Sequence, residues 1–327
     1  PCGALGASEL ADTAEILVAP MMESYALANG HDNVAAVVVA YFPGREILNL
    51  VATLRAELVQ VWVVDNTPQE TDWLQAELPS DVRLLSPGKN LGVAGAYNRV
   101  IRAVRDESLP LMSLFLFDQD SEPSAACLHT LINAMNELRS RGERVAQVGP
   151  AYYEKQRAFF PPLIEVGRWW LRRTPLDRAQ ALHPVSYMIS SGSLVALDAL
   201  ALVGGFGEDL FIDYVDIEFG LRCQHAGLGS WIVKAAVMEH AIGEQPLRVG
   251  QWTLPSHSAI RRRYQVRNAL LLMRRGYMPL AWKVAESFKI ILRFMFLAIA
   301  RKPFQGQISA WFSGFLDGAL GRSGPID

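Results

Sequence analysis

Long apolar runs without charge are missing from this chain of 327 residues. No window reaches eighteen such residues, and the closest, near 288–300, is interrupted by Lys289 and Arg293. We therefore expect no membrane-spanning helix. The first thirty residues also lack the basic-then-apolar plan of a signal peptide, which argues against a secretory leader.

Cysteine and excess charge are scarce as well. The three cysteines are scattered, with neither metal-ligand spacing nor a disulfide framework (Cys2, Cys127 and Cys223). This usage favours a reducing, cytoplasmic compartment. The formal net charge is only −2, so the molecule as a whole is not expected to bind polyanions such as nucleic acids.

The basic residues are unevenly distributed along the chain. The segment 258–302 contains eleven Lys and Arg residues and a single acid, Glu286. A basic segment of this kind suggests an anionic neighbour, such as a membrane surface or a phosphate-bearing ligand. We expect peripheral association with the inner membrane through residues 258–305.

Within 279–300 the charged residues recur at helical spacing and mark one face of an amphipathic helix (Lys283, Glu286, Lys289 and Arg293). The other face is apolar (Val284, Phe288, Ile291, Leu292 and Met295). This apolar face either packs on the rest of the protein or lies in a membrane interface. The pattern alone leaves both arrangements open.

Three regions are predicted along the chain. Residues 1–32 are Ala-rich and acidic without a sustained hydrophobic period, which predicts a poorly ordered leader. Residues 33–245 alternate apolar strands with helices and form the main α/β unit. Residues 246–327 turn helical from Ser258 onward.

Strand patterns alternate with helical patterns in the α/β unit. The predicted strands cover 34–41, 61–64, 82–86, 111–117, 145–148, 185–193 and 229–238, and the predicted helices cover 46–57, 92–104, 123–139 and a segment that ends near Gly227. This order predicts a mainly parallel sheet covered by helices on both faces. The aromatic-rich segment 151–184 is either a loop or hairpin over a site or simple surface packing.

Polar residues gather where the predicted strands end. These residues are Tyr41, Asp65, Asn66, Asn90, Asp118 and Asp120. Ligands of parallel α/β sheets bind outside the carboxyl ends of the strands. A purely structural sheet does not explain this repetition, so we predict a ligand site at this edge.

The stretch Asp118-Gln119-Asp120 follows a buried apolar run directly. Side chains alternate along an extended backbone, so the two aspartates point the same way. Two neighbouring carboxylates repel each other unless a positive group lies between them, and Mg²⁺ accepts one or two carboxylates together with phosphate oxygens. The alternative is a solvated turn after a strand.

A second group of polar residues suits a nucleotide. Asp65, Asn66 and the amides of 90–98 offer donors and acceptors for a nucleobase and a ribose. Gly92, at the start of a helix, would leave backbone N–H groups for phosphate, or would only allow close packing there. The spacing is neither G-x-G-x-x-G nor a P-loop, which disfavours dinucleotide and ATP-hydrolase functions.

Two further groups of residues are candidates for chemistry. Asp213 and Asp216, with Glu218 nearby, lie in a segment that is otherwise apolar, where burial raises a carboxyl pKa and suits a general base. The alternative is a cluster of acids in the first turn of a helix. His240 ends a predicted strand and is a candidate third metal ligand, although a lone histidine is more often structural.

The assembled motifs resemble the inverting glycosyltransferases of family 2, which have a GT-A fold. The matching stretches are 38–43, 64–66, 90–98, 117–121, 189–192, 210–218, 239–240 and 263–268. Within the family the chain looks most like bacterial rhamnosyltransferases, above all the type that adds the second rhamnose of rhamnolipids. O-antigen rhamnosyltransferases share the same motifs. The resemblance covers about residues 34–270.

The resemblance implies roles for the acidic residues. Asp65 would face the pyrimidine base, and Asp118 the ribose and the metal. Asp120 would bind Mg²⁺ or Mn²⁺ on the diphosphate, with His240 completing the coordination. Asp216 falls where the family places its catalytic base.

The motif departs from the family at Val215, which stands where a Glu is usual, so Asp213 remains a second candidate base. Arg267 would neutralise the leaving diphosphate. The donor-binding set that the resemblance implies is Tyr41, Asp65, Asn66, Asn90, Gly92, Asn98, Asp118, Gln119 and Arg267.

The function implied is transfer of L-rhamnose from a nucleotide diphosphate sugar, with dTDP-L-rhamnose expected, to a rhamnosyl lipid or a lipid-linked glycan. Two other functions fit parts of the pattern. One is a non-catalytic nucleotide-sugar-binding protein on a membrane surface, and the other is a sugar nucleotidyltransferase, which also uses paired acids on such a sheet. The pattern does not fix the oligomeric state.

Overall fold

The computed structural model describes residues 33–326 apart from 70, 156–157, 241–243, 250–251, 257 and 301–304. For the remaining residues of 240–257 and 296–305, only the backbone is described, not the side chains. The predicted leader, 1–32, lies outside the described residues, so that expectation stays a prediction.

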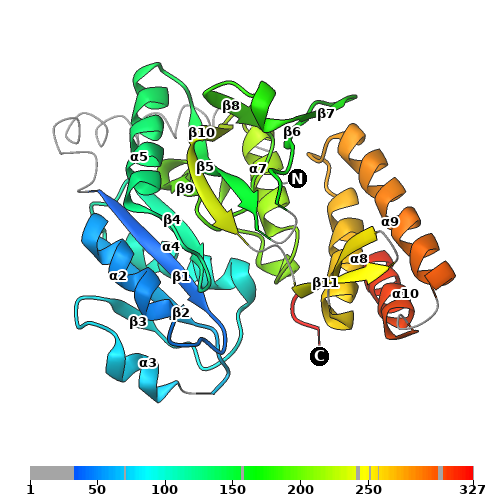
Figure 1. Cartoon of the computed structure of the whole chain (residues 1–327), viewed down its shortest axis with the longest axis horizontal. Coiled ribbons are helices and arrows are strands. Elements are labelled where there is room, and N and C mark those ends of the chain that lie inside the picture. Colours follow the sequence, from blue (N-terminus) through cyan, green and yellow to red (C-terminus); the bar gives the residue numbers. More distant parts are fainter. Residues whose placement is uncertain are drawn as a thin grey trace, which may run out of the picture.

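The centre of the molecule is an eight-stranded sheet with the order β3-β2-β1-β4-β9-β5-β10-β8 (Figure 1). Its strands are β1 (Val34–Ala40), β2 (Gln60–Asp65), β3 (Arg83–Leu85), β4 (Ser113–Asp118), β5 (Val145–Glu154), β8 (Leu182–Val185), β9 (Leu194–Ala196) and β10 (Gly229–His240). The pairs β3-β2, β2-β1, β1-β4 and β5-β10 are parallel. The pairs that contain β8 or β9 are antiparallel. The predicted mainly parallel sheet is confirmed.

Helices cover both faces of this sheet. They are α2 (Ile47–Glu57), α3 (Asp72–Glu77), α4 (Gly92–Asp106), α5 (Ala125–Ser140), α6 (Leu197–Val203) and α7 (Val215–His225). α2 and α5 contact each other on one face. On the other face Phe206 packs against Tyr97 of α4 and Phe219 of α7. β1 is buried at every position, as expected for a strand covered on both sides.

The predicted strand over 185–193 is wrong. β8 ends at Val185 and β9 begins at Leu194, and the residues between them form a turn. Gly192 N–H donates to Leu116 O at 2.6 Å and Ser193 N–H donates to Ser190 O at 3.0 Å, so the chain folds back against β4 here. The residues of this segment are apolar or small because the turn is packed inside the protein.

The segment 151–184, for which a loop or hairpin over a site and simple surface packing were both open, contains a hairpin of β6 (Leu163–Val166) and β7 (Leu171–Thr174). A short 3₁₀ helix, Leu176–Arg178, follows it. Among the predicted helices, those over 46–57, 92–104 and 123–139 are confirmed as α2, α4 and α5 to within two residues at each end. The pattern did not predict the short helix α3.

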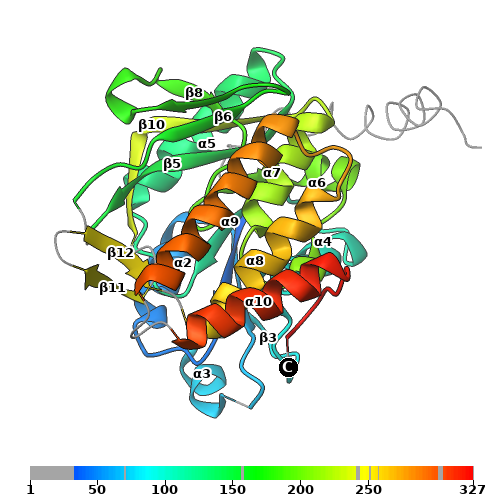
Figure 2. The ribbon, with the colours of Figure 1, turned by 90° about the vertical axis from the view of Figure 1, so that its right-hand side faces the viewer.

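The C-terminal region is helical, as predicted. After the hairpin of β11 (Glu244–Val249) and β12 (Trp252–Ser256) come α8 (Ala259–Met273), α9 (Leu280–Ala300) and α10 (Gln305–Ala319). The three helices lie together on one side of the molecule, where α9 and α10 face outward (Figure 2). No helix in the described ranges is long and apolar enough to cross a membrane. The boundary at residue 245 stays a prediction.

Candidate active site

The strand register brings the predicted strand-end residues to one level. Ala40 of β1 pairs with Asp65 of β2, and Val39 pairs with Asp118 of β4. Tyr41, the next residue of the chain, therefore stands between the two acids at the carboxyl edge of three adjacent parallel strands. This is the edge at which such sheets bind ligands.

The stretch 118–120 turns away from the sheet as β4 ends. Tyr41 N–H donates to the side-chain oxygen of Gln119 at 2.7 Å, which ties the end of β1 to this turn. Asp118 N–H donates to Ser191 Oγ at 3.2 Å, so the turn at 190–193 supports β4 from its other side. Asp120 is exposed. Both carboxylates thus stand at the edge of the sheet beside solvent.

Asp65 and Asn66 have different surroundings. Asp65 is buried and accepts a hydrogen bond from Thr67 N–H at 3.0 Å, which fixes its carboxylate at the end of β2. Asn66 is equally buried, and its side-chain amide donates to Gly92 O at 2.9 Å. Asn66 therefore holds the turn before α4, and its contribution to donor binding is indirect.

The first two N–H groups of α4 are not available to phosphate, contrary to the expectation for the start of this helix. Gly92 N–H donates to the side chain of Asn90 at 2.8 Å, and Val93 N–H donates to Phe211 O at 2.9 Å. These two donors are used inside the protein, and the Asn90 side-chain oxygen is used with them. The sequence correctly indicated close packing at Gly92, which was the alternative.

The structure also corrects the predicted role of Asn98 in binding the sugar donor. Its side-chain nitrogen donates to Phe206 O and to Glu208 Oε1, each at 2.8 Å, and its oxygen accepts from Phe206 N–H at 2.8 Å. The amide is therefore occupied on both sides and is buried. Asn98 anchors the segment that begins at Phe206 to α4, which leaves it unsuited to recognising a nucleobase.

The segment 206–214 carries unusual backbone strain. Three of its non-glycine residues, Phe211, Asp213 and Tyr214, have φ between 62° and 67°. Strain of this kind persists only where surrounding contacts hold it, and it concentrates at functional sites. Asn268 supplies the holding contacts, since its fully buried side-chain amide lies 2.7 Å from Ile212 O and 3.1 Å from Asp213 O.

Asp216 lies in the first turn of α7, directly after the strained segment. Burial raises the pKa of its carboxyl to about 6, and the negative charges of Asp213 and Asp118 add to this effect. A hydrogen bond from Ile217 N–H at 2.8 Å works in the opposite direction. A carboxylate with a pKa near 6 is suited to accept a proton close to neutral pH. Val93 N–H donates to Phe211 O at 2.9 Å, and Asn66 donates to Gly92 O at 2.9 Å, so the segment that leads to Asp216 is tied to the end of β2 through the start of α4.

Asp213 has a cation as its partner. Arg261 of α8 lies 2.9 Å from its carboxylate, and the Asp213 side chain is only 12% exposed. Of the two candidate bases, Asp213 is thus the one held in an ion pair. Glu218, the third acid of the cluster, is buried between Arg222 and Arg275, each 2.8 Å away, and has a structural role.

Arg267 does not face the site, so its predicted contact with the diphosphate is a further correction. Its side chain is 1% exposed. The guanidinium donates to Gly324 O at 2.6 Å, to Leu210 O at 3.2 Å and to Asn268 Oδ1 at 3.0 Å. Arg267 joins the C-terminal segment to the strained loop. A cation that does contact the candidate site is Arg261 of α8, which pairs with Asp213 at 2.9 Å.

In the described part of the chain, no three His, Cys, Asp or Glu side chains gather closely enough to hold a metal ion by themselves. The backbone of His240 ends β10 opposite Glu154, while its side chain lies outside the described residues. Asp118 and Asp120 remain, and two carboxylates at a ligand-binding edge are the protein share that Mg²⁺ needs when a diphosphate supplies other oxygens. The residues present therefore fit such a metal.

Three supporting residues received no role from the sequence. Asn268 was part of a matching motif, but nothing in the pattern linked it to the loop at 210–213. Ser191 and Tyr152 support the end of β4, since the Tyr152 hydroxyl donates to Ser191 O and Ser191 Oγ lies 2.6 Å from Ser121 Oγ. The small-residue stretch 190–193 was the only signal for this contact.

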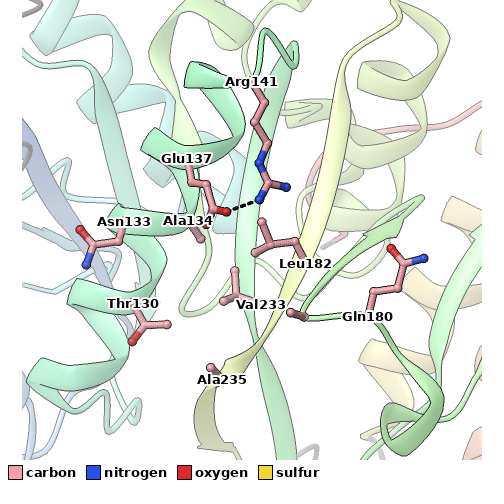
Figure 3. A pocket seen from close by; sticks show the side chains of 10 residues that line it. Thr130, Asn133, Ala134, Glu137, Arg141, Gln180, Leu182, Val233 and Ala235 are labelled. Carbon is pink, nitrogen blue, oxygen red and sulfur yellow. Dashed lines mark hydrogen bonds and ion pairs between the residues drawn. The ribbon is translucent and has the colours of Figure 1, made fainter.

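A surface hollow of about 520 Å³ lies elsewhere, between α5, the segment before β8 and the middle of β10 (Figure 3). Five of its ten lining residues are polar or charged, and the two charged ones, Glu137 and Arg141, are paired with each other. It contains none of the acids described above. The hollow is separate from the candidate site and offers no catalytic group.

Comparison with known proteins agrees with this geometry. The profile of the family described as "Glycosyl transferase family 2" matches residues 35–202. A dTDP-rhamnosyl transferase, RfbF, of Shigella flexneri is 31% identical over 90% of this chain and 98% of its own length. An N-acetylglucosaminyl-diphospho-decaprenol L-rhamnosyltransferase of Mycobacterium tuberculosis is 26% identical over 64% of this chain and 76% of its own.

A solved structure has the same fold. The crystal structure of GalNAc-T7 with UDP, GalNAc and Mn²⁺ superposes with a TM-score of 0.51 at 12% identity. It covers 85% of this chain, which spans 59% of that one. The likeness supports the GT-A-type arrangement of a mainly parallel sheet between helices. The match to the family profile and the 31% identity to the Shigella flexneri relative establish that this chain belongs to glycosyl transferase family 2.

Proposed function

We propose that this enzyme transfers L-rhamnose from dTDP-L-rhamnose to a lipid-linked glycan at the cytoplasmic face of the inner membrane. The donor is supported by the name of the Shigella flexneri relative, and the lipid diphosphate acceptor by that of the mycobacterial relatives. A rhamnosyl lipid is the second acceptor class, supported by the sequence motifs alone.

The observation that carries the proposal is the position of Asp216. Asp216 lies in the first turn of α7, after a strained segment that is tied to the start of α4 by the bond from Val93 N–H to Phe211 O at 2.9 Å. Burial, with smaller contributions from the charges of Asp213 and Asp118, raises the pKa of its carboxyl to about 6. A protein that only binds a nucleotide sugar has no need of a base next to its diphosphate-binding acids. Of the two candidates we assign the base to Asp216, because Asp213 is neutralised by Arg261.

The reaction is a single displacement. The acceptor hydroxyl oxygen forms a bond to the anomeric carbon while the bond from that carbon to the diphosphate oxygen breaks on the opposite face. The hydroxyl proton passes to Asp216, and the electron pair of the broken bond leaves with dTDP. The configuration at the anomeric carbon is inverted without a covalent enzyme intermediate.

The residues at the strand ends bind and orient the donor in this proposal. Asp65, which is fixed by Thr67, accepts a hydrogen bond from the nucleobase. Asp118 accepts a hydrogen bond from the ribose. Asp118 and Asp120 would hold Mg²⁺ or Mn²⁺, which when bound neutralises charge on the diphosphate. The link between Tyr41 and Gln119 keeps the two sides of this donor site at a fixed separation.

The direct test is a transfer assay with the purified full chain. The protein is incubated with dTDP-L-rhamnose, MgCl₂ or MnCl₂ and either N-acetylglucosaminyl-diphospho-polyprenol or a rhamnosyl lipid. We expect release of dTDP together with a product heavier by one rhamnose, measured by mass spectrometry. Donor binding without either product would favour a non-catalytic protein, and pyrophosphate release from dTTP would favour a nucleotidyltransferase.

Asp120→Asn is expected to lower the transfer rate at least about 100-fold, because the metal would lose an anionic ligand worth several kcal/mol in the transition state. The apparent affinity for Mn²⁺, from the dependence of rate on its concentration, should fall as well. Asp120 is exposed, so the unfolding temperature should not change. The control is Asp106→Asn, which changes an exposed acid at the end of α4 and should leave activity unchanged. Unaltered transfer by Asp120→Asn would remove the metal assignment.

A further inference from the structure

α9 turns an apolar face to the outside. Six large apolar side chains of this helix are between 44% and 62% exposed (Leu280, Val284, Phe288, Ile291, Leu292 and Met295). Their spacing puts them on one side of the helix. Of the two arrangements that the sequence left open, packing of this face against the protein is therefore excluded for the described side chains.

The polar side of α9 points inward instead. Glu286, the only acid of the helix, is 2% exposed. It accepts a hydrogen bond from the Tyr214 hydroxyl at 2.6 Å and pairs with Lys289 at 2.8 Å. Lys283 Nζ donates to Arg275 O at 2.9 Å. A surface helix of a soluble protein has the opposite polarity, with its charges outside and its apolar side chains inside.

α10 has the same inverted polarity. Phe312, Phe315 and Leu316, together with Leu320 directly after the helix, are between 45% and 58% exposed. The one acid of α10, Asp317, is 3% exposed and pairs with Arg263 at 2.7 Å and Arg322 at 3.1 Å. Two consecutive helices thus bury their acids, together with Trp282, Ile290 and Trp311, and expose most of their other described large apolar side chains.

The two exposed faces are continuous. α9 and α10 lie on the same side of the molecule (Figure 2). Phe294 of α9 packs against Trp311 and Phe312 of α10, with ring centroids 4.6 Å and 5.5 Å apart. We call the ten exposed apolar residues of 280–295 and 312–320 the outer helical face. Contiguous apolar surfaces of this kind mark interaction sites.

The charge around the outer helical face identifies what covers it. Exposed basic side chains border it, among them Arg274 and Arg293, while both acids of α9 and α10 are buried. In a two-fold dimer the same patch of each copy meets its counterpart, so these cations would be brought together. Anionic lipid headgroups neutralise them instead, and acyl chains accept the apolar side chains.

We propose that the outer helical face of α9 and α10 inserts into the interface of an anionic lipid bilayer. The helices lie along the surface, with the apolar side chains at the acyl boundary and the basic side chains at the headgroups. One of the two helices that would contact lipid, α9, is hydrogen-bonded to the candidate base segment, because Glu286 accepts from the Tyr214 hydroxyl. Docking therefore holds that segment next to the headgroups, where a lipid-linked acceptor carries its sugar; this last point rests on the proposed function.

The test is sedimentation of the full chain with vesicles, without donor or acceptor, so that its result does not depend on catalysis. We expect binding to vesicles of phosphatidylcholine with phosphatidylglycerol and much weaker binding to phosphatidylcholine alone. The double variant Phe288→Ser/Phe312→Ser should lower the partition coefficient by roughly tenfold for each side chain. Both side chains are more than half exposed, so the unfolding temperature should match that of the parent chain.

The matched control replaces two exposed apolar residues elsewhere, Val59→Ser/Leu202→Ser, and should bind vesicles as the parent does. Three results would overturn the proposal. They are a parent chain that stays in the supernatant with anionic vesicles at low salt, equal binding by both double variants, and a parent dimer in solution that only Phe288→Ser/Phe312→Ser dissociates. The last result would assign the face to a second copy of the chain.

Discussion

Asp216→Asn is expected to lower kcat by about 10³-fold, within the range of 10²–10⁴ for a general base, while the chain still binds its nucleotide sugar. The amide has almost the same size as the carboxylate but cannot take the proton of the acceptor hydroxyl. Ile217 N–H can still donate to the amide oxygen, so the start of α7 should keep its structure. Initial rates give kcat, and calorimetric titration with dTDP-L-rhamnose gives the donor affinity.

Asp213→Asn is the matched control for this variant. The two aspartates are three positions apart in the chain, but the carboxylate of Asp213 is paired with Arg261 at 2.9 Å. We expect a smaller loss of kcat for Asp213→Asn, because the main consequence is a looser contact between the segment and α8. If Asp213→Asn is the inactive variant and Asp216→Asn retains turnover, the base is Asp213.

The pH dependence should identify the same group. The ionised carboxylate is the active form, and the pKa of Asp216 is raised to about 6 by burial and by its acidic neighbours. The rate should therefore be constant above this pKa and fall about tenfold for each pH unit below it. Asp213→Asn removes one of the neighbouring negative charges, so the acidic limb should move to lower pH. An acidic limb that is unchanged in Asp216→Asn would contradict the assignment.

The sheet and its functional edge could be predicted because they depend on local patterns. Apolar runs such as 34–40 and 113–117 define buried strands, and the polar residues that follow them mark the strand ends. In parallel strands these ends must meet at one edge, so Asp65 and Asp118 were expected at the same edge of the sheet. The observed register places them there, one on each side of β1. The carboxyl edge of the sheet could therefore be predicted without knowledge of long-range contacts.

The hydrogen-bond partners within the site could not be predicted in this way. Asn98 is occupied by Phe206 and Arg267 by Gly324, contacts that span 108 and 57 residues. An amide or a guanidinium beside a predicted site has the same appearance in the sequence whether it faces a ligand or a backbone carbonyl. For this reason both residues were assigned to the donor, although the fold uses them to hold its own segments.

The orientation of α9 could not be predicted from the sequence for the same reason. Hydrophobic periodicity identifies which residues share a side of a helix, but it does not say which side faces the protein. The default is that the apolar side is buried. Here the bond between Tyr214 and Glu286, 72 residues apart, turns the polar side inward. Only the tertiary contacts reveal that the apolar side of the helix is the exposed one.

Gly92→Ala is expected to be the most destabilising single substitution among the site-supporting residues. Gly92 has φ of 70°, a conformation that costs an alanine about 1–2 kcal/mol. An added methyl group would also lie 2.7 Å from a ring carbon of Phe211 and 2.8 Å from its carbonyl carbon. Forcing an extra methyl group into packed surroundings costs about 1–3 kcal/mol. The free energy of unfolding should therefore fall by about 2–5 kcal/mol in total.

The chain supplies a matched control for this substitution. Gly88 has nearly the same φ, 69°, but no atom within 4 Å of an added methyl group. Gly88→Ala should therefore lower the free energy of unfolding only by the cost of the backbone conformation, about 1–2 kcal/mol, and should leave activity unchanged. Gly92→Ala should in addition lose turnover, because Phe211 O accepts Val93 N–H at 2.9 Å and a displaced Phe211 moves the segment that leads to Asp216. Urea unfolding and kcat measured on both variants separate the two effects. Equal stabilities for the two variants would mean that the contact with Phe211 gives way without cost and does not position the base.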